Sequence, residues 1–240
     1  MISVCLASYN GATHIAEQLR SILAQLGADD EVIVSDDGST DQTAHIVTTL
    51  AQTSTVPIRF TRNPGQRGYA ANFEHALRQA QGDYIFLSDQ DDVWLPHKVR
   101  VMLQALRDEH YDLCVSNARI TDAQLQVTHP DYFQARGVHT GLVGNFVKFG
   151  YLGCCIALTR QQLQRSLPFP SNRRYCTHDN WLFLCAQAMG RVKVIHEPLL
   201  LYRRHDLTST TGAFNAHKPL TFRISYRLYL AWQLLRRALL

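Results

Sequence analysis

The sequence predicts an α/β protein in which helices cover both faces of a mostly parallel central sheet. Through the first half of the 240 residues, short apolar runs alternate with longer segments whose apolar residues recur at helical spacing. Such alternation is typical of parallel strands joined by crossover helices. The hydrophobic content of 46% and the charged content of 18% indicate a globular protein with a sizeable core.

The first half contains five predicted strands separated by helices. The strands are expected at 2–7, 31–35, 57–61, 84–88 and 112–117. The intervening helices are indicated by periodic apolar residues, and they begin near Ile15, Thr40, Ala70 and His97. Gly82 follows the third helix and is expected to be its C-cap.

The second half is less regular. A hairpin is expected at 119–129, loops or short helices at 131–150, and strands at 153–158, 193–195 and 199–202. A helix at 177–189 is expected to face Trp181, Leu182, Cys185 and Ala188 inward. No clear linker or internal repeat interrupts the chain, which favours one domain over 1–214 and a separate C-terminal helix over 215–240.

Composition also bears on location. Met1 leads directly into the strand at 2–7 without a basic n-region, so no signal peptide is expected. No segment approaches the ~18 apolar residues of a membrane-spanning helix. The six cysteines show no Cys-x-x-Cys spacing, which favours buried thiols in a reducing cytoplasm over disulfides or zinc. We therefore expect a cytoplasmic protein.

The net charge of +4 is unevenly distributed along the chain. Residues 215–240 carry five basic residues and no acid, so the rest of the chain has a net charge of −1. A near-neutral body argues against nucleic-acid binding, and a basic tail indicates a local partner.

The tail also has an amphipathic pattern. Its apolar residues recur at helical steps between the arginines, at Leu220, Ile224, Leu228, Trp232, Leu235 and Leu239. One interpretation is a helix over 219–240 that makes peripheral contact with an anionic membrane, at the inner face of the plasma membrane. The other is a terminal helix that packs on the domain or on a dimer partner. The pattern alone leaves both open.

An acidic cluster, Asp89-Gln90-Asp91-Asp92, directly follows the apolar strand at 84–88. Three carboxylates in four residues repel one another, and hard cations such as Mg²⁺ or Mn²⁺ prefer oxygen ligands of this kind. The carboxyl end of a strand is also where open α/β sheets bind ligands. The simpler interpretation is a solvated acidic turn.

The loop after the first predicted strand is Ala7-Ser8-Tyr9-Asn10. Its aromatic ring could stack on a base, and its amides could hydrogen-bond to one. The simpler interpretation is a polar turn. The loop lacks the Gly-x-Gly-x-x-Gly pattern, which disfavours a dinucleotide-binding domain.

Two further loops follow the second and third predicted strands. In the first, Asp36 or Asp37 could accept a hydrogen bond from a base or ribose, or both could merely cap the next helix. In the second, at 63–69, Arg67 could meet a phosphate or base between two glycines. The simpler interpretation there is a glycine-rich connection.

The order of these motifs is more specific than any one of them. Ser-Tyr-Asn, then Asp-Asp-Gly-Ser-Thr-Asp, then Asn-x-Gly, then Gly-Asp-Tyr-Ile-x-x-Leu-Ser-Asp-Gln-Asp-Asp-x-Trp resembles the family 2 glycosyltransferases, which have the GT-A fold. Within that family the chain looks most like bacterial rhamnosyltransferase-type enzymes of surface polysaccharide synthesis. The resemblance covers 2–117 and returns at 151–206. It implies a nucleotide-binding half at 1–117 and an acceptor half at 118–214.

The resemblance implies roles for residues in the first half. The nucleoside pocket would be lined by Ala7, Tyr9, Asn10, Asp37 and Arg67. Asp89 would lie near the ribose. Asp91 would bind Mg²⁺ or Mn²⁺, with Asp92 as a weaker candidate.

Three later residues complete the implied site. Asp179 would take the proton from the acceptor hydroxyl, as inverting transfer requires. Without the resemblance, it would be a first-turn Asp that stabilises a helix. Arg203 would reach the leaving diphosphate, and His205 would reach the diphosphate or the metal.

The implied function is inverting, metal-dependent transfer of a sugar from a nucleoside-diphosphate sugar to a glycan or lipid-linked acceptor. Rhamnose is suggested by resemblance alone, and uridine- and guanosine-diphosphate sugars stay open. The Gln-x-x-Arg-Trp motif and membrane helices of processive synthases are missing from the sequence. The alternative function is a non-catalytic sugar-nucleotide-binding or scaffold protein.

Overall fold

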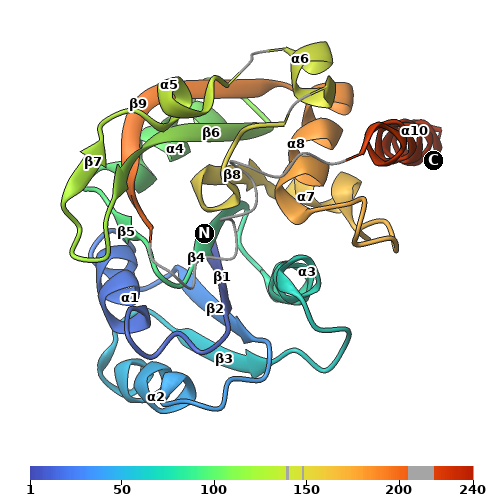
Figure 1. The fold of residues 1–240 in the computed structure, drawn as a ribbon. Coiled ribbons are helices and arrows are strands. Elements are labelled where there is room, and N and C mark those ends of the chain that lie inside the picture. Colours follow the sequence, from blue (N-terminus) through green and yellow to red (C-terminus); the bar gives the residue numbers. More distant parts are fainter. Residues whose placement is uncertain (139–140, 148, 205–218, 240) are drawn as a thin grey trace.

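The computed structural model describes residues 1–138, 141–147, 149–204 and 219–239. Its first half alternates strands and helices as predicted: β1 (Ile2–Ser8), α1 (Ile15–Leu23), β2 (Glu31–Asp36), α2 (Thr43–Thr53), β3 (Ile58–Arg62), α3 (Tyr69–Gln79) and β4 (Tyr84–Asp89). β1 lies between β2 and β4 and pairs with both in parallel. Its Val4, Cys5 and Leu6 are fully buried because helices cover both faces of this sheet (Figure 1).

The second half continues the same sheet with mixed strand directions. Its elements are β5 (Val93–Trp94), α4 (Lys98–Arg107), β6 (Leu113–Thr121), β7 (Val127–His129), α5 (Tyr132–Arg136), α6 (Leu142–Val147), η1 (Gly153–Cys155), β8 (Ile156–Thr159), α7 (Arg160–Ser166), α8 (His178–Met189), β9 (Val192–Arg203) and α10 (Leu220–Ala238). The strand order is β3-β2-β1-β4-β8-β6-β9-β5, with β7 paired to β6. Only β5, β7 and β8 of the described strands run against the others.

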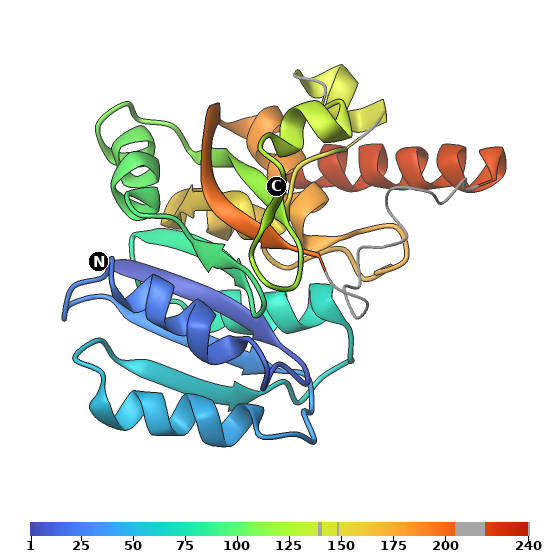
Figure 2. The same ribbon diagram turned by 60° about the vertical axis from the view of Figure 1, so that its left-hand side comes forward.

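The sheet curls strongly, as the connection between β4 and β5 shows. The two strands are separated by three residues, yet β5 lies at the far end of the strand order, where it pairs with β9. The sheet must therefore bend back so that its β9 end approaches the end of β4 (Figure 2). This bend brings the last residues of β9 beside the acidic turn.

Several predicted elements are confirmed in the second half. The hairpin at 119–129 is formed by β6 and β7, and the region at 131–150 contains the short helices α5 and α6. The strands predicted at 193–195 and 199–202 form a single bent strand, β9, whose register with β6 shifts near Asn117.

Four details of the prediction are wrong. Residues 153–155 form a 3₁₀ turn, so the strand starts only at Ile156. The helix α7 has no counterpart in the prediction, and Ala188 is exposed although its helix is otherwise well buried. Gly82 does not cap α3, because the chain leaves the helix in an extended conformation at Ala80.

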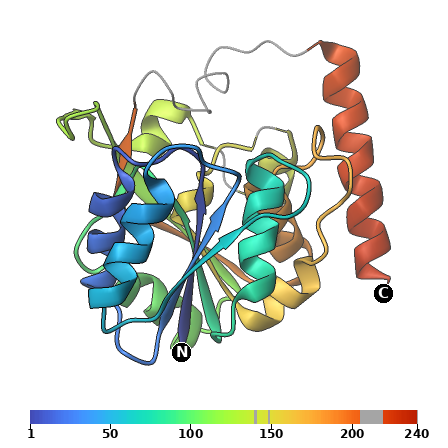
Figure 3. The ribbon, with the colours of Figure 1, turned by 90° about the horizontal axis from the view of Figure 1, so that it is seen from below.

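Within the described residues, no helix combines the length and the hydropathy needed to cross a membrane. The 19-residue helix α10 lies along one side of the molecule, next to α8 (Figure 3).

Candidate functional site

The candidate site begins where three neighbouring strands end. In the sheet register, Ala7 of β1 lies between Ser35 of β2 and Asp89 of β4. The loops that follow these strands therefore start side by side at the carboxyl edge of the sheet, where open α/β sheets bind ligands. The structure thus brings together the predicted residues Ala7, Tyr9 and Asp89.

Gln90 links the first loop to the acidic turn. Its amide nitrogen donates to the Tyr9 carbonyl at 2.9 Å, and its amide oxygen accepts from the Tyr9 N–H at 2.8 Å. Gly11 leaves room for this contact, since a Cβ atom there would lie 2.2 Å from Gln90 Oε1. Tyr9 is 51% exposed, which leaves this aromatic residue accessible to a planar ligand.

Asn10 links the first loop to the second. Its backbone has a φ of 48°, a left-handed conformation that asparagine tolerates well. Its N–H donates to Ser39 Oγ at 2.8 Å, and its Oδ1 accepts from the Thr40 N–H at 2.9 Å. Asn10 therefore holds two loops in register through its own polar atoms.

The two acids of the second loop have different partners. Asp36 is buried and accepts from the N–H groups of Gly38 and Ser39, at 3.1 and 2.8 Å, so it shapes the turn. Asp37 instead accepts from the side chain of Asn63 at 3.0 Å and from the Gly68 N–H at 2.7 Å. Asp37 therefore holds the third loop against the second.

Arg67 lies on the exposed surface of that third loop. Its guanidinium covers the Gly38 turn, since a Cβ atom on Gly38 would lie 3.2 Å from its terminal nitrogen. Gly38 has a φ of 89°, which favours glycine at this position. The cation is thus held over the second loop, on the side of the predicted nucleoside pocket.

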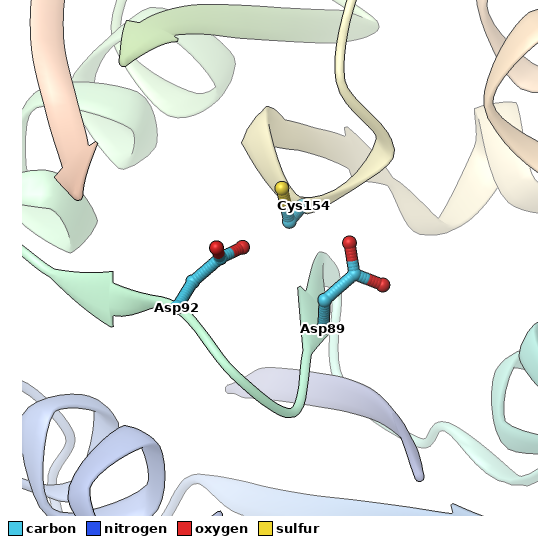
Figure 4. Close-up of side chains that lie close together, drawn as sticks. All are labelled: Asp89, Asp92 and Cys154. Atoms are coloured by element: carbon cyan, nitrogen blue, oxygen red, sulfur yellow. The ribbon is translucent and has the colours of Figure 1, made fainter. Parts of the chain in front are cut away.

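The acidic turn gathers two carboxylates around a thiol (Figure 4). Ligand atoms of Asp89, Asp92 and Cys154 all lie within 4.8 Å of one another, with Cys154 contributed by η1. Lys98 is fully buried and donates to the Cys154 carbonyl at 3.1 Å, which holds η1 over the turn. Burial raises the pKa of Asp89 to about 7, and the charge of Asp91 adds to this effect.

Asp92 is the most buried acid of the turn, at 1% exposure. Its Oδ1 accepts from the Arg203 N–H at 3.1 Å, and its Oδ2 has no hydrogen-bond partner among the described residues. Burial raises the pKa of Asp92 well above its ordinary value, and the charges of Asp91 and Asp89 raise it further. The ionised form of Asp92 is therefore costly in this position unless a cation compensates its charge.

The donor set at the turn fits a divalent cation. Carboxylate oxygens suit Mg²⁺ and Mn²⁺, and the nearby sulfur favours the softer of the two, Mn²⁺. The structure gathers Asp89 and Asp92 most closely, whereas the sequence favoured Asp91. Asp91 is half-buried in the same turn. The other predicted metal ligand, His205, lies outside the described residues.

Arg203 holds the acidic turn in place. Its Nε donates to the Asp91 carbonyl at 2.8 Å, and its terminal nitrogens donate to the Ala123 carbonyl at 2.7 Å and to Glu17 Oε2 at 2.5 Å. The side chain is 5% exposed. Much of its hydrogen-bonding capacity is thus used within the protein, and its predicted contact with a diphosphate stays a prediction.

Asp179 approaches the acidic turn from the opposite half of the sequence. It lies in the first turn of α8, where the helix dipole favours a negative charge. Its Oδ1 accepts from the Asn180 N–H at 2.8 Å, the only hydrogen bond of this carboxylate among the described residues. The charge of Asp179 also contributes, after burial and Asp91, to the raised pKa of Asp89. The ring of the preceding residue, His178, lies against Gly153 of η1, and η1 places Cys154 beside Asp89 and Asp92, so the start of α8 borders the acidic turn.

His178 supports this helix start from within the protein. Its ring stacks on Phe73 with centroids 4.0 Å apart, and burial lowers its pKa, so the ring is neutral. A Cβ atom on Gly153 would lie 2.3 Å from His178 Nε2, so only glycine fits between this ring and η1.

Sequence reasoning missed the residues that connect the loops. Glu17, Lys98 and Cys154 are in no recognisable motif, Gln90 was given no role within its motif, and each of the four acts on a residue far away in the chain. The position of Gln90 inside the acidic cluster was the one available signal. The partners of the others depend on how the sheet curls.

The model of the family described as "Glycosyl transferase family 2" matches residues 3–197. The dTDP-rhamnosyl transferase RfbG of Shigella flexneri is 27% identical over 221 residues, which cover 84% of this chain and 72% of that protein.

Two solved structures are similar in fold. TarS residues 1–349 of S. aureus, in complex with UDP-GlcNAc, superimposes with a TM-score of 0.73 at 18% identity, over 96% of this chain and 65% of that one. The mannosyltransferase PcManGT from Pyrobaculum calidifontis, in complex with GDP-Man and Mn²⁺, gives a TM-score of 0.64 at 20% identity, over 99% and 72%. The chain thus spans about two thirds of the TarS structure. These likenesses establish the GT-A fold, and the family match over most of the sequence shows that the chain belongs to glycosyl transferase family 2.

Proposed function

We propose that the protein transfers a sugar from a nucleoside-diphosphate sugar to a hydroxyl group of an acceptor, with inversion at the anomeric carbon. The observation that carries the proposal is that the start of α8, which bears Asp179, borders the acidic turn through η1. Family membership and the folds of TarS and PcManGT, both solved with nucleotide sugars, support the choice of donor.

The proposed roles follow from the geometry of the loops. Tyr9, at the carboxyl end of β1, stacks on the base beside Ala7, and Asn10 fixes the loop. Asp37 and Arg67 form the opposite wall of the nucleoside pocket. We assign nucleotide binding to 1–117 and acceptor binding to 118–214.

In the proposed reaction, the acceptor hydroxyl attacks the anomeric carbon and the bond from that carbon to the diphosphate oxygen breaks. Asp179 accepts the hydroxyl proton, and the electron pair of the broken bond leaves with the nucleoside diphosphate. When bound at Asp89, Asp91 and Asp92, Mg²⁺ or Mn²⁺ would neutralise charge on this leaving group. Arg203 keeps the turn that presents these carboxylates in place.

We propose rhamnose as the sugar and surface polysaccharide synthesis as the setting. The support is the likeness to RfbG, whose name gives a dTDP-rhamnosyl donor. We also propose a glycan or lipid-linked acceptor and peripheral membrane contact through 219–240. The support for this contact is the exposed apolar stripe of α10.

Two substitutions test the proposal against a non-catalytic sugar-nucleotide-binding protein. Asp179→Asn should lower the rate of sugar transfer by at least ~10²-fold, because the base is lost, and should leave nucleotide binding unchanged. Asp91→Asn should lower transfer and also weaken Mn²⁺-dependent binding of UDP, dTDP or GDP in calorimetry. Wild-type protein that binds a nucleotide sugar but transfers nothing to glycan or lipid-linked acceptors would favour the binding protein.

A further inference from the structure

The helix α10 presents two chemically different faces. Its inner face is aromatic: Phe222 and Tyr229 pack against Tyr175, with ring centroids 5.2 and 5.7 Å apart. Leu230 is fully buried, and Arg237 donates to the Pro168 carbonyl at 2.6 Å. The helix is therefore firmly seated on the segment that leads into α8.

Tyr226 on this inner face reaches the start of α8. The side-chain amide of Asn180, which is 3% exposed, donates to the Tyr226 hydroxyl. Asn180 directly follows Asp179 and donates its own N–H to the Asp179 carboxylate. Tyr226 thus lies two hydrogen bonds away from the proposed base. Burial, and to a smaller extent Asp179, raises the pKa of Tyr226 to about 12, so its hydroxyl stays protonated.

The outer face carries the apolar stripe predicted from the sequence, and all of it is exposed. The exposed fractions are 68% for Leu220, 49% for Ile224, 67% for Leu228, 59% for Trp232, 59% for Leu235 and 86% for Leu239. The two interpretations of the tail are thus compatible, since the helix packs on the domain through one face and leaves the other uncovered (Figure 3).

Charge decides which partner fits the outer face. The helix carries four arginines and no acid, and Arg236 is exposed beside the stripe. A second copy of the helix would bring two helices of net positive charge together, whereas an anionic lipid surface would attract the exposed Arg236 and bury the leucines. Trp232 in the stripe suits the boundary between lipid and water.

We propose that α10 docks its outer stripe on an anionic lipid surface and, through Tyr226, positions the start of α8 for an acceptor that arrives from that surface. The positioning role of Tyr226 rests on the proposed function of Asp179, whereas the docking does not. A lipid-linked glycan is the acceptor class that such an arrangement favours.

Vesicle binding tests the docking. The full-length protein should float with phosphatidylglycerol-containing vesicles and not with pure phosphatidylcholine. Leu228→Glu should weaken this binding at least ~10-fold, because it puts a negative charge into the exposed stripe that would enter the lipid. Thr49→Glu, which adds the same charge to an exposed position of α2, should bind like the wild type. Equal binding of Leu228→Glu and wild type would overturn the proposal. So would a wild-type dimer in sedimentation that Leu228→Glu dissociates.

Hydrogen exchange tests the positioning without any need for activity. Tyr226→Phe removes the acceptor for Asn180, so amides at the start of α8 should exchange about fivefold faster. Tyr229→Phe is the matched control, because it removes a hydroxyl from the same face that accepts from the Asn172 N–H instead. Identical exchange in the two variants would overturn the positioning role.

The kinetic signature separates positioning from general stability. Tyr226→Phe should lower kcat about tenfold and leave the donor KM unchanged, since a displaced base affects the chemical step. Tyr229→Phe should change neither. Suppose that Tyr226→Phe speeds hydrogen exchange at the start of α8 but neither the wild type nor the variants transfer sugar. The proposed function then fails, whereas the link from Tyr226 to the start of α8 stands.

Discussion

At the scale of single residues, the acidic turn is held by side chains that the sequence did not assign to this task. Arg203 holds its backbone, Gln90 ties it to the first loop, and Cys154 lies against its carboxylates. Two of the carboxyl groups have raised pKa values because they are desolvated and close to another acid. A bound cation would therefore stabilise the ionised forms of these carboxyl groups.

This electrostatic strain predicts a dependence of stability on pH. Because the pKa of Asp92 is higher in the folded than in the unfolded protein, folding favours its protonated form. Without a cation, the free energy of unfolding should fall as the pH rises from the ordinary Asp value through the raised one. Asp92→Asn cannot ionise and should reduce this fall, measured as Tm in EDTA between about pH 5 and about pH 8. If Tm depended on pH equally in the variant and the wild type, the raised pKa of Asp92 would be contradicted.

At the scale of elements, Gly82 shows how tightly the strands are assembled. A Cβ atom at this position would lie 2.7 Å from the Ser3 nitrogen and 2.9 Å from the Met1 carbonyl oxygen. Both atoms belong to the backbone at the start of β1, which cannot move without disturbing the central strand. The glycine is therefore required by close packing between the entry to β4 and β1.

Gly82→Ala should accordingly destabilise the protein. Overpacking against backbone costs about 1–3 kcal/mol, which lowers Tm by several degrees in a chain of this size. Gly27→Ala is a suitable control, because its Cβ atom would meet only Asp30, at 3.7 Å. Differential scanning calorimetry of both variants measures the difference, and an equal Tm for the two would refute the packing argument.

The elements themselves were largely predictable, and the contacts between them were not. Buried strands such as β1 and β2 are mostly apolar runs, and the apolar residues of α1 recur at helical spacing. The local sequence pattern was therefore enough to predict these elements. The strand expected from 153 was misjudged because apolar composition does not distinguish a buried 3₁₀ turn from a strand. The partners of Arg203 and Asn180 were not predictable, since they depend on the curl of the sheet and on where α10 packs.

At the scale of the whole molecule, the four loops lie together at one edge of the sheet, so a donor bound there as proposed should stabilise the entire fold. We expect nucleotide sugars with Mn²⁺ to raise Tm in a thermal-shift panel, because ligand at about 100 times its Kd adds roughly 2.7 kcal/mol. The donor with the largest shift among dTDP-, UDP- and GDP-sugars identifies the nucleotide. EDTA should abolish most of the shift, and a shift that EDTA leaves intact would contradict cation-assisted binding.

The curl of the sheet has a consequence for how the protein is made. β5 follows the acidic turn directly, but its only strand partner among the described residues is β9, near the end of the domain. Arg203, the last residue of β9, is also what fixes the turn. During vectorial synthesis from the N-terminus, the strands from β1 to β4 can pair early, while the acidic turn must wait until residue 203 has left the ribosome. The nascent chain would thus pair strands β1 to β4 before its acidic turn reaches the folded conformation.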